Sequence, residues 1–199
     1  MRAGHGGVVI GSEMSGDVRR VTISNCVFDG TDRGIRLKST RGRGGIVEDI
    51  RVSNIVMNNI QKEAVTLNLF YSDVPAEPVT DRTPIFRNIH ISGLTGTNVN
   101  MATTVLGIEE SPIYNITFSD INMDAQTGFV VNDVKDITFE NVRVNTKIGA
   151  AFKFERASNL RLNNVYNPKP LADKPVMEVK DVQDMFIQGS FPEAGSSAY

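Results

Sequence analysis

The sequence lacks several residue types that would point to common kinds of site. Its 199 residues include no tryptophan, two histidines and a single cysteine, Cys26. One cysteine excludes a disulfide within the chain and argues against a zinc cluster, so no metal and no cofactor is predicted. No apolar run approaches the ~18 residues of a membrane-spanning helix. The first residues do not form a signal peptide either, so no membrane partner is expected and the compartment stays open.

An excess of charge of one sign is also lacking. Lys and Arg number 21 against 23 Asp and Glu, a formal net charge of -2, and such a balance argues against generic binding of nucleic acid. Hydrophobic residues make up 40% and charged residues 22%, which is an ordinary globular composition with enough apolar surface for one core. The one local departure is a cluster of cations, Arg33, Arg36, Lys38, Arg41 and Arg43.

A short unit recurs along nearly the whole chain, in the form apolar-x-apolar-x-(Asn, Asp or Gly)-apolar. Its alternation with period two predicts a strand with one buried face. Asn, Asp and Gly tolerate the left-handed conformation of a sharp bend, and a second short strand follows each bend. We expect the Asn side chains to hydrogen-bond to one another from unit to unit. The copies are Val21–Cys26, Ile50–Ile55, Ile89–Leu94, Ile116–Ile121, Ile137–Val142, Leu160–Val165 and a weaker one from Met185.

The repeat predicts an all-β fold, a right-handed parallel β-helix of about seven coils. Leucine-rich repeats are the main alternative, but their leucine consensus is missing. We expect a single β-helix domain over residues 1–191 and a C-terminal tail over residues 192–199. The longest interruption of the repeat, Tyr71–Pro84, is expected to be a surface loop that forms one wall of a groove.

Two cations lie two residues apart in the predicted strand Ile35–Lys38. Because Ile35 and Leu37 face the core, Arg36 and Lys38 both point outward, roughly 7 Å apart. Such a pair can hold a carboxylate, with a bidentate fork from Arg36 and a point charge from Lys38. The spacing alone is more often that of a solvated basic face, so both interpretations remain open.

A histidine between two glycines, His5, lies about one coil earlier in the chain. Aligning residues 8–10 with residues 35–37 places His5 level with Asp32. A lone histidine is usually structural or merely exposed, but its place beside two cations favours a functional site. Glu13 and Asp32 are the nearby acids.

At these residues the chain resembles the polygalacturonase-type glycoside hydrolases of family 28, particularly bacterial exo-acting members. Residues 4–13 look like the family's Gly-His-Gly motif. Residues 28–38 look like its Arg-Ile-Lys motif, with Leu37 at the middle position. The resemblance is specific from Gly4 to about Glu48, and the family's fold is the right-handed parallel β-helix.

The resemblance implies roles for four residues. His5 would support the catalytic acids, and Arg36 and Lys38 would bind a galacturonate carboxylate beside the scissile bond. Tyr71 is the best match to the family's substrate-binding tyrosine. The implied partner is an acidic polysaccharide or oligogalacturonate, as in pectin of the plant cell wall, and the implied location is secreted or periplasmic.

The motifs that carry the family's catalytic acids are missing upstream of His5. Inverting hydrolysis needs an acid that protonates the leaving oxygen and a carboxylate that activates water, roughly 6.5–9.5 Å apart. Histidine, arginine and lysine cannot replace that pair, and Glu13 and Asp32 are only possible accessory acids. We therefore expect the C-terminal portion of a pectin-degrading glycosidase, which binds uronate but is weakly active or inactive alone.

Two other functions are known to be compatible with such a fold. A non-catalytic uronate-binding or assembly module would use the same cations without chemistry. A pectate-lyase-like enzyme would need calcium and an arginine base, and the sequence shows no convincing acidic cluster for calcium. With the N-terminal cap absent, the first rung would present unpaired strand edges, and we expect a homo-oligomer that associates through it.

Overall fold

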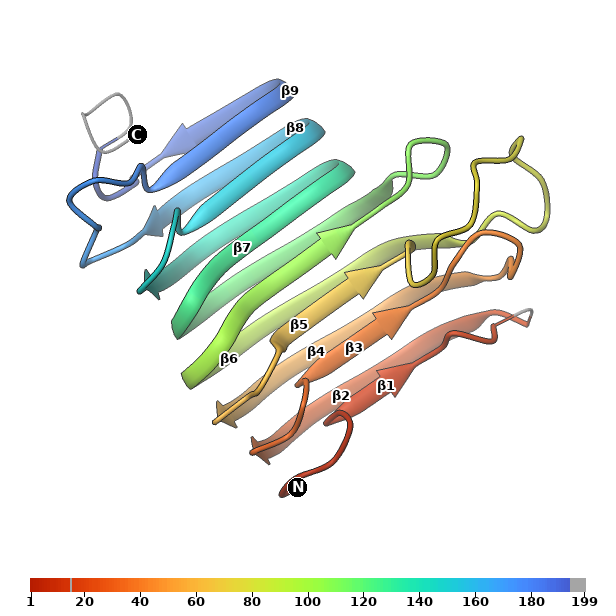
Figure 1. The fold of residues 1–199 in the computed structure, drawn as a ribbon, viewed down its shortest axis with the longest axis horizontal. Coiled ribbons are helices and arrows are strands. Elements are labelled where there is room, and N and C mark those ends of the chain that lie inside the picture. The colour runs from red at the N-terminus through yellow and green to blue at the C-terminus, as the bar shows by residue number, and fades with distance from the viewer. Residues whose placement is uncertain (15, 194–199) are drawn as a thin grey trace.

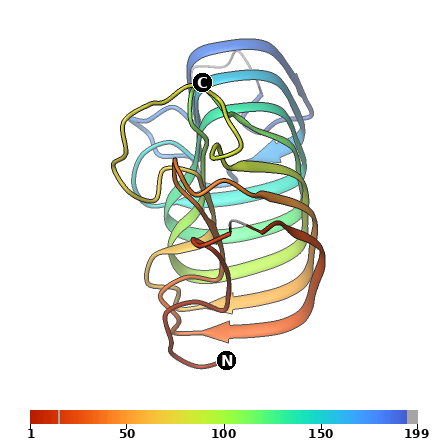
Figure 2. The same ribbon diagram turned by 90° about the vertical axis from the view of Figure 1, so that its right-hand side faces the viewer.

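The computed structural model describes residues 1–14 and 16–193, which form nine strands and no helix (Figure 1). Every pairing between the named strands is parallel, and successive coils lie one on top of the next from β1 to β9 (Figures 1 and 2). The strands are β1 (Val8–Ile10), β2 (Val18–Asp29), β3 (Ile35–Lys38), β4 (Ile46–Asn58), β5 (Glu63–Asn68), β6 (Ile85–Leu106), β7 (Ile113–Thr146), β8 (Phe152–Tyr166) and β9 (Met177–Gln188).

The predicted right-handed parallel β-helix of about seven turns is confirmed. One face of the column follows the order β1-β3-β5-β6-β7-β8-β9, while β2 pairs with β4 and β4 with β6. The long strands β6 to β9 continue around corners of the coil, because only single residues leave the extended conformation there. The register follows the sequence repeat, with Val21 opposite Ile50, Ile50 opposite Ile89, and Ile89 opposite Ile116.

The corners carry the predicted left-handed residues. In the six complete copies of the unit, the residue at the bend has a φ between 52° and 61°. Asn54 Nδ2 donates to Asn25 Oδ1 at 2.6 Å, and Asn164 Nδ2 donates to Asn141 Oδ1 at 2.8 Å. Asn141 in turn donates to Asp120 at 3.1 Å. The expected hydrogen bonding between units is therefore present, and Gly93 interrupts it because it has no side chain.

The interior of the column is mainly apolar, and its middle is filled by aromatic rings. Phe118 and Phe139 stack with ring centroids 5.3 Å apart, and Phe129 meets both edge-on at 5.6 Å. Phe152 and Phe154 extend this cluster into β8. All five rings have at most 1% of their surface exposed, so the successive coils share one continuous core.

The loops are distributed unevenly around the column. The segments 39–45, 69–84 and 107–112 follow β3, β5 and β6, and all three project at the same end of the strands (Figure 1). Residues 71–84 contain no strand and stand out from the column (Figure 2), as predicted for this interruption. The arrangement brings three loops together beside β3.

Two expectations about the ends of the chain remain predictions. Of the proposed tail at 192–199, residues 194–199 lie outside the described residues. At the other end, Val27 on β2 is about half exposed, but the expected association through this face is not tested by the fold. Within residues 1–14 and 16–193 there is no helix with the length and apolar character needed to cross a membrane.

Candidate functional site

The strand register confirms the alignment predicted for the site. β1 pairs with β3 so that Val9 lies opposite Arg36, with Val8 opposite Ile35. The backbone N–H of Asp32 donates to the carbonyl of Gly4 at 2.9 Å, which places His5 beside Asp32 on the neighbouring coil. His5 and Arg36, 31 positions apart in the sequence, are in direct contact.

His5 bridges an acid and a guanidinium. Its Nδ1 lies 3.1 Å from Asp32 Oδ2, and its Nε2 lies 3.0 Å from Arg36 Nη1. Arg36 can only donate, so Nε2 must accept and the proton of the neutral ring must reside on Nδ1, from which it is donated to Asp32. Asp32 therefore fixes the tautomer that lets His5 hold Arg36 in place.

Arg36 is buried, although it points away from the core. Only 7% of its surface is exposed. The aromatic ring of Tyr71 lies 5.4 Å from the guanidinium carbon, and Thr66 occupies the register position above Arg36 on β5. Lys38 is half-buried, with its Nζ 4.2 Å from the centre of the same tyrosine ring. This burial argues against the solvated basic face that the spacing left open.

Arg36, Lys38, Tyr71 and Thr66 line a small cavity of about 70 Å³, which we call the Arg36 recess. Thr104 Oγ1 donates to Thr66 Oγ1 at 2.7 Å and closes the wall on the next coil. Arg33 and Glu63, which form an ion pair with each other, also line the cavity. Beside that pair, the recess presents the two cations Arg36 and Lys38, one aromatic face and hydroxyl groups to whatever enters it.

Within the described part of the chain, Arg36 and Lys38 have no acidic partner, although Glu63 also lines the recess. Among the described residues, neither Arg36 nor Lys38 lies within 4.0 Å of a carboxylate oxygen, whereas Arg33 pairs with Glu63 at 2.5 Å. A buried charge without a counter-charge is costly, because the attraction that would offset its desolvation is missing. The recess is thus matched to an anion.

Tyr71 is held in place by the loop that follows β3. Its backbone N–H donates to the carbonyl of Ser39 at 3.1 Å, and Thr40 Oγ1 donates to the next carbonyl, that of Ser72, at 3.1 Å. Arg41 Nη1 donates to the carbonyl of Val74 at 3.0 Å. The resemblance pointed to Tyr71, but the sequence predicted none of these contacts, because they join two loops of irregular conformation.

Arg41 also anchors a third loop. Its guanidinium forms a bidentate ion pair with Glu110, with Nη2 2.9 Å from Oε2. The hydrogen bond from Arg41 is the main cause that lowers the pKa of the Glu110 carboxyl below its usual value. The segments 39–45, 69–84 and 107–112 are therefore tied together through one side chain.

The two candidate accessory acids lie apart. Asp32 precedes β3, whereas Glu13 follows β1 and pairs with Arg43 at 2.6 Å, near the opposite ends of these two strands. The Asp32 and Lys38 ends of β3 are roughly 20 Å apart at ~3.3 Å per residue. A backbone hydrogen bond and then Arg43 lower the pKa of Glu13, which is exposed. The geometry does not set these two acids on either side of one bond.

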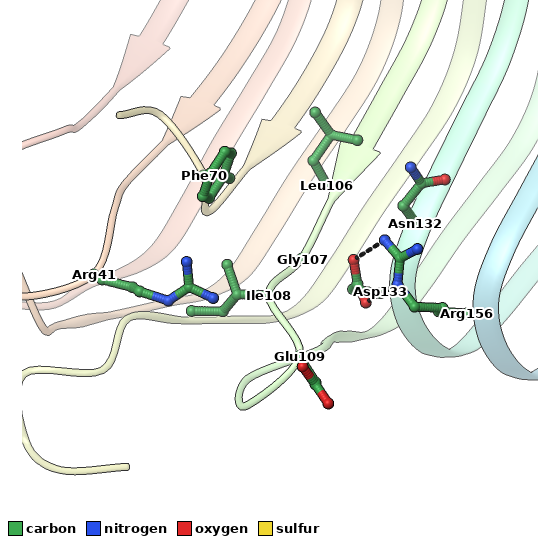
Figure 3. Close-up of a pocket in the computed structure, with 9 residues that line it drawn as sticks. All are labelled: Arg41, Phe70, Leu106, Gly107, Ile108, Glu109, Asn132, Asp133 and Arg156. Carbon is green, nitrogen blue, oxygen red and sulfur yellow. Dashed lines mark hydrogen bonds and ion pairs between the residues drawn. The ribbon is translucent and has the colours of Figure 1, made fainter. Parts of the chain in front are cut away.

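A larger cavity of about 380 Å³ adjoins the recess and was not predicted from the sequence. Figure 3 shows Phe70 and Leu106 on one side of it, with Arg41 and Arg156 facing each other across it. We call it the Phe70 pocket. Leu106 lines both cavities, and Phe70 directly precedes Tyr71, so the two cavities lie next to each other.

No grouping of three or more metal-ligating side chains occurs in the described part of the chain.

The model of Glycosyl hydrolases family 28 matches residues 1–130, more than half of the chain. The chain belongs to glycosyl hydrolase family 28. The matched part of this family 28 chain includes His5, Arg36, Lys38 and Tyr71.

Relatives with similar sequences come from bacteria, plants and fungi. The family 28 chain is 28% identical over 174 residues to an exo-poly-alpha-D-galacturonosidase of Dickeya chrysanthemi, covering 81% of this chain and 29% of the relative. It is 28% identical over 116 residues to a probable polygalacturonase of Vitis vinifera, covering 58% and 24%. It is 34% identical over 90 residues to an endo-polygalacturonase of Pectobacterium carotovorum subsp. carotovorum, covering 40% and 22%.

The family 28 chain therefore spans less than a third of the length of each of these relatives. No solved structure gives a significant match to it.

Proposed function

We propose that this chain is the uronate-binding portion of a pectin-degrading hydrolase that acts on galacturonic-acid glycosidic bonds. The observation that supports this most is the burial of Arg36 beside Lys38 without a carboxylate partner among the described residues. A galacturonate carboxylate supplies the missing negative charge and fits the planar fork of a guanidinium.

Each residue of the site has a distinct role in this proposal. Arg36 and Lys38 bind the carboxylate of one sugar, and the ring of Tyr71 forms the wall against which that sugar rests. His5 does not touch the bond in this scheme. In its neutral form it accepts a hydrogen bond from Arg36 and keeps the guanidinium aimed at the recess.

The second candidate function is a non-catalytic uronate-binding module. It is favoured by the position of Glu13 and Asp32 near opposite ends of β1 and β3. Because its lowered pKa keeps Glu13 ionised near neutral pH, this residue has no proton to give to a leaving oxygen. We therefore propose that the isolated chain binds galacturonate and hydrolyses polygalacturonate weakly or not at all.

Calorimetric titration with galacturonate tests the binding site. The Arg36→Ala/Lys38→Ala double variant is expected to bind at least about 10-fold more weakly, a loss of ~1.4 kcal/mol. Raising the salt concentration should weaken binding to the unmodified chain. Lys153→Ala/Lys180→Ala, which removes two cations from β8 and β9, serves as the control and should bind normally. Equal affinity in the two double variants would reject the site.

Release of reducing sugar from polygalacturonate separates the two candidate functions. The binding module predicts no release above background from the purified chain. Release that disappears in Glu13→Gln or Asp32→Asn, with galacturonate binding unchanged in the same variant, would show that one of these acids takes part in hydrolysis. Such a result would favour an active enzyme over the module.

A further inference from the structure

A pocket of about 410 Å³ lies away from the proposed site, among the turns that precede β8 and β9. These turns, residues 147–151 and 167–176, lie at the edge of the column opposite to the three loops that follow β3, β5 and β6 (Figure 1). We call this cavity the Lys147 pocket. Its walls come from β6, β7 and the two turns, so successive coils build it together.

The cations of the Lys147 pocket are far from those of the Arg36 recess. The strands β3, β5, β6, β7, β8 and β9 follow one another in that order on one face of the column. The turns that carry Lys147 and Lys169 precede β8 and β9, which are four and five strand spacings from β3, or roughly 19 and 24 Å at ~4.8 Å per spacing. One sugar carboxylate therefore cannot contact both groups of cations.

Cations outnumber acids at the Lys147 pocket. Arg143, Lys147 and Lys169 line it, together with one acid, Asp124. This acid is already engaged, because Arg143 Nη1 lies 3.5 Å from Asp124 Oδ1 and Asn145 donates a hydrogen bond to the same oxygen. Within residues 1–14 and 16–193, no carboxylate lies within 4.0 Å of either lysine. The remaining charges of the two turns, one aspartate and one lysine, cancel, so the pocket attracts an anion.

The backbone of both lysines is held in place. The N–H of Lys147 donates to the carbonyl of Gln126 at 3.1 Å. The N–H of Lys169 donates to Asn167 Oδ1 at 3.0 Å, and Asn167 is buried and donates its own N–H to the carbonyl of Phe191. The turns are therefore ordered before a ligand arrives, which reduces the entropy lost on binding.

Amide side chains supply the uncharged polar part of the Lys147 pocket, to which Asn98, Gln126 and Asn145 contribute. Asn98 Nδ2 donates to Asn59 Oδ1 at 2.8 Å, which leaves the oxygen of Asn98 to accept from a ligand. Asn145 Oδ1 is buried without a hydrogen-bond partner in the described chain. A neighbouring hollow of about 490 Å³ shares Asn98 and Gln126 and adds three further amide side chains. Amides both donate to and accept from hydroxyl groups, so they match a hydroxylated ligand.

We propose that the Lys147 pocket is a second binding site for an acidic saccharide, separate from the Arg36 recess and without chemistry of its own. Lys147 and Lys169 bind a carboxylate, and the oxygen of Asn98 accepts a hydrogen bond from a sugar hydroxyl. An acidic polysaccharide held there stays at the surface of the chain, which raises its effective concentration at the recess. The choice of an acidic sugar among anions rests on the proposed function, whereas the charge and position of the pocket do not.

Calorimetric titration of the Arg36→Ala/Lys38→Ala variant tests the Lys147 pocket, because the recess no longer contributes. Galacturonate should still bind this variant, but more weakly than the unmodified chain, since Lys147 and Lys169 are exposed whereas Arg36 is buried. Adding Lys147→Ala/Lys169→Ala should lower the remaining affinity at least about 10-fold. Galactose, which lacks the carboxylate, should not bind measurably.

Lys135→Ala/Lys180→Ala in the same background is the charge-matched control. Lys135 lies against the ring of Tyr114 and Lys180 binds Glu155, and neither lysine lines the pocket. The control changes the net charge equally and should leave the remaining affinity for galacturonate unchanged.

Asn98→Gly tests the contribution of the amides. Asn98 has a φ of 53°, which glycine adopts without strain, so this variant removes the amide and keeps the corner. It should weaken galacturonate binding to the pocket several-fold and leave the binding of inorganic phosphate unchanged. Asn164→Gly, at another left-handed corner with a φ of 52°, is the matched control and should change neither.

The outcomes separate this inference from the proposed function. Complete loss of galacturonate binding in the Arg36→Ala/Lys38→Ala variant would overturn the second site and leave the proposed function intact. Inorganic phosphate that binds as tightly as galacturonate would overturn the assignment to a saccharide, because the pocket would then recognise charge alone. Galacturonate binding that ignores Arg36 and Lys38 but depends on Lys147 and Lys169 would support the second site and reject the proposed function.

Discussion

At the scale of single residues, Arg36 shows a conflict between folding and binding. Its guanidinium is nearly inaccessible to water, and the described residues supply a histidine nitrogen and a tyrosine ring but no carboxylate. Replacing buried charges with apolar groups of similar volume is often neutral or stabilising. The residue is therefore best explained by the anion that it is placed to bind.

We predict that Arg36→Met abolishes galacturonate binding while leaving the free energy of unfolding unchanged or raising it by about 1 kcal/mol. The matched control is Arg33→Met, which removes a cation paired with Glu63 and should destabilise the chain by about 1–3 kcal/mol. Urea denaturation and calorimetric titration measure the two effects. A loss of stability in Arg36→Met as large as in Arg33→Met would refute this explanation.

The residue-level features of the site were only partly predictable from the sequence. The alignment of residues 8–10 with 35–37 correctly placed His5 beside Asp32, because parallel coils keep a regular register. The burial of Arg36 was not predictable, since it depends on how the loop carrying Tyr71 folds back. The position of Glu13 depends on irregular backbone after β1 and was also missed.

At the scale of elements, the three loops beside β3 depend on the Arg41–Glu110 ion pair. Both side chains are largely buried, at 11% and 15% exposure. The same arginine donates to the backbone of the loop that carries Tyr71. Loss of the pair is therefore expected to loosen the wall of the Arg36 recess.

Glu110→Gln is predicted to lower the free energy of unfolding by about 1–3 kcal/mol at pH 7. The pKa of Glu110 is lowered in the folded chain by the Arg41 hydrogen bond, so its contribution is present above its ordinary value of 4.5. The contribution is lost as the pH falls through the lowered folded value. The difference in the free energy of unfolding between Glu110→Gln and the unmodified chain should therefore become smaller below pH 4.5.

Denaturation at a series of pH values checks this prediction. Glu13→Gln is the control, because its ion pair with Arg43 is exposed and should contribute little. If Glu110→Gln lowers the free energy of unfolding by the same amount at low pH as at pH 7, the loss of stability comes from packing and not from the charge of Glu110.

Elements with a regular repeat were the most predictable part of the molecule. The bend positions were identified because few residues tolerate a positive φ, and Asn25, Asn54 and Asn141 all adopt it. The Phe70 pocket was not identified, because its walls come from five separate coils. The positions of these walls relative to one another depend on the lengths of the loops and not on the sequence repeat.

At the scale of the whole molecule, each coil contacts mainly its neighbours, so stability is expected to vary along the column. The aromatic cluster joins β7 to β8, and Phe139 touches each of the four other rings. A change at this ring should therefore affect nearby coils more than distant ones.

We predict that Phe139→Ala costs about 3–5 kcal/mol of local stability. Hydrogen exchange should show the largest loss of protection in β7 and β8 and a smaller loss in β2 and β4. Phe186→Ala, which removes a half-exposed ring from β9, is expected to change stability by no more than ~0.5 kcal/mol. Equal loss of protection in every strand would show that the column opens as a single unit.

The uneven placement of the loops also determines where the chain can accept inserted or deleted residues. Single left-handed residues form the tight corners, and an inserted residue there would disrupt the stacking of the coils above and below. The segments after β3, β5 and β6 already vary in length at one end of the strands. Insertions and deletions can therefore accumulate beside the recess and remodel ligand preference while the stacked core keeps its register, which makes these segments the natural positions for loop grafting.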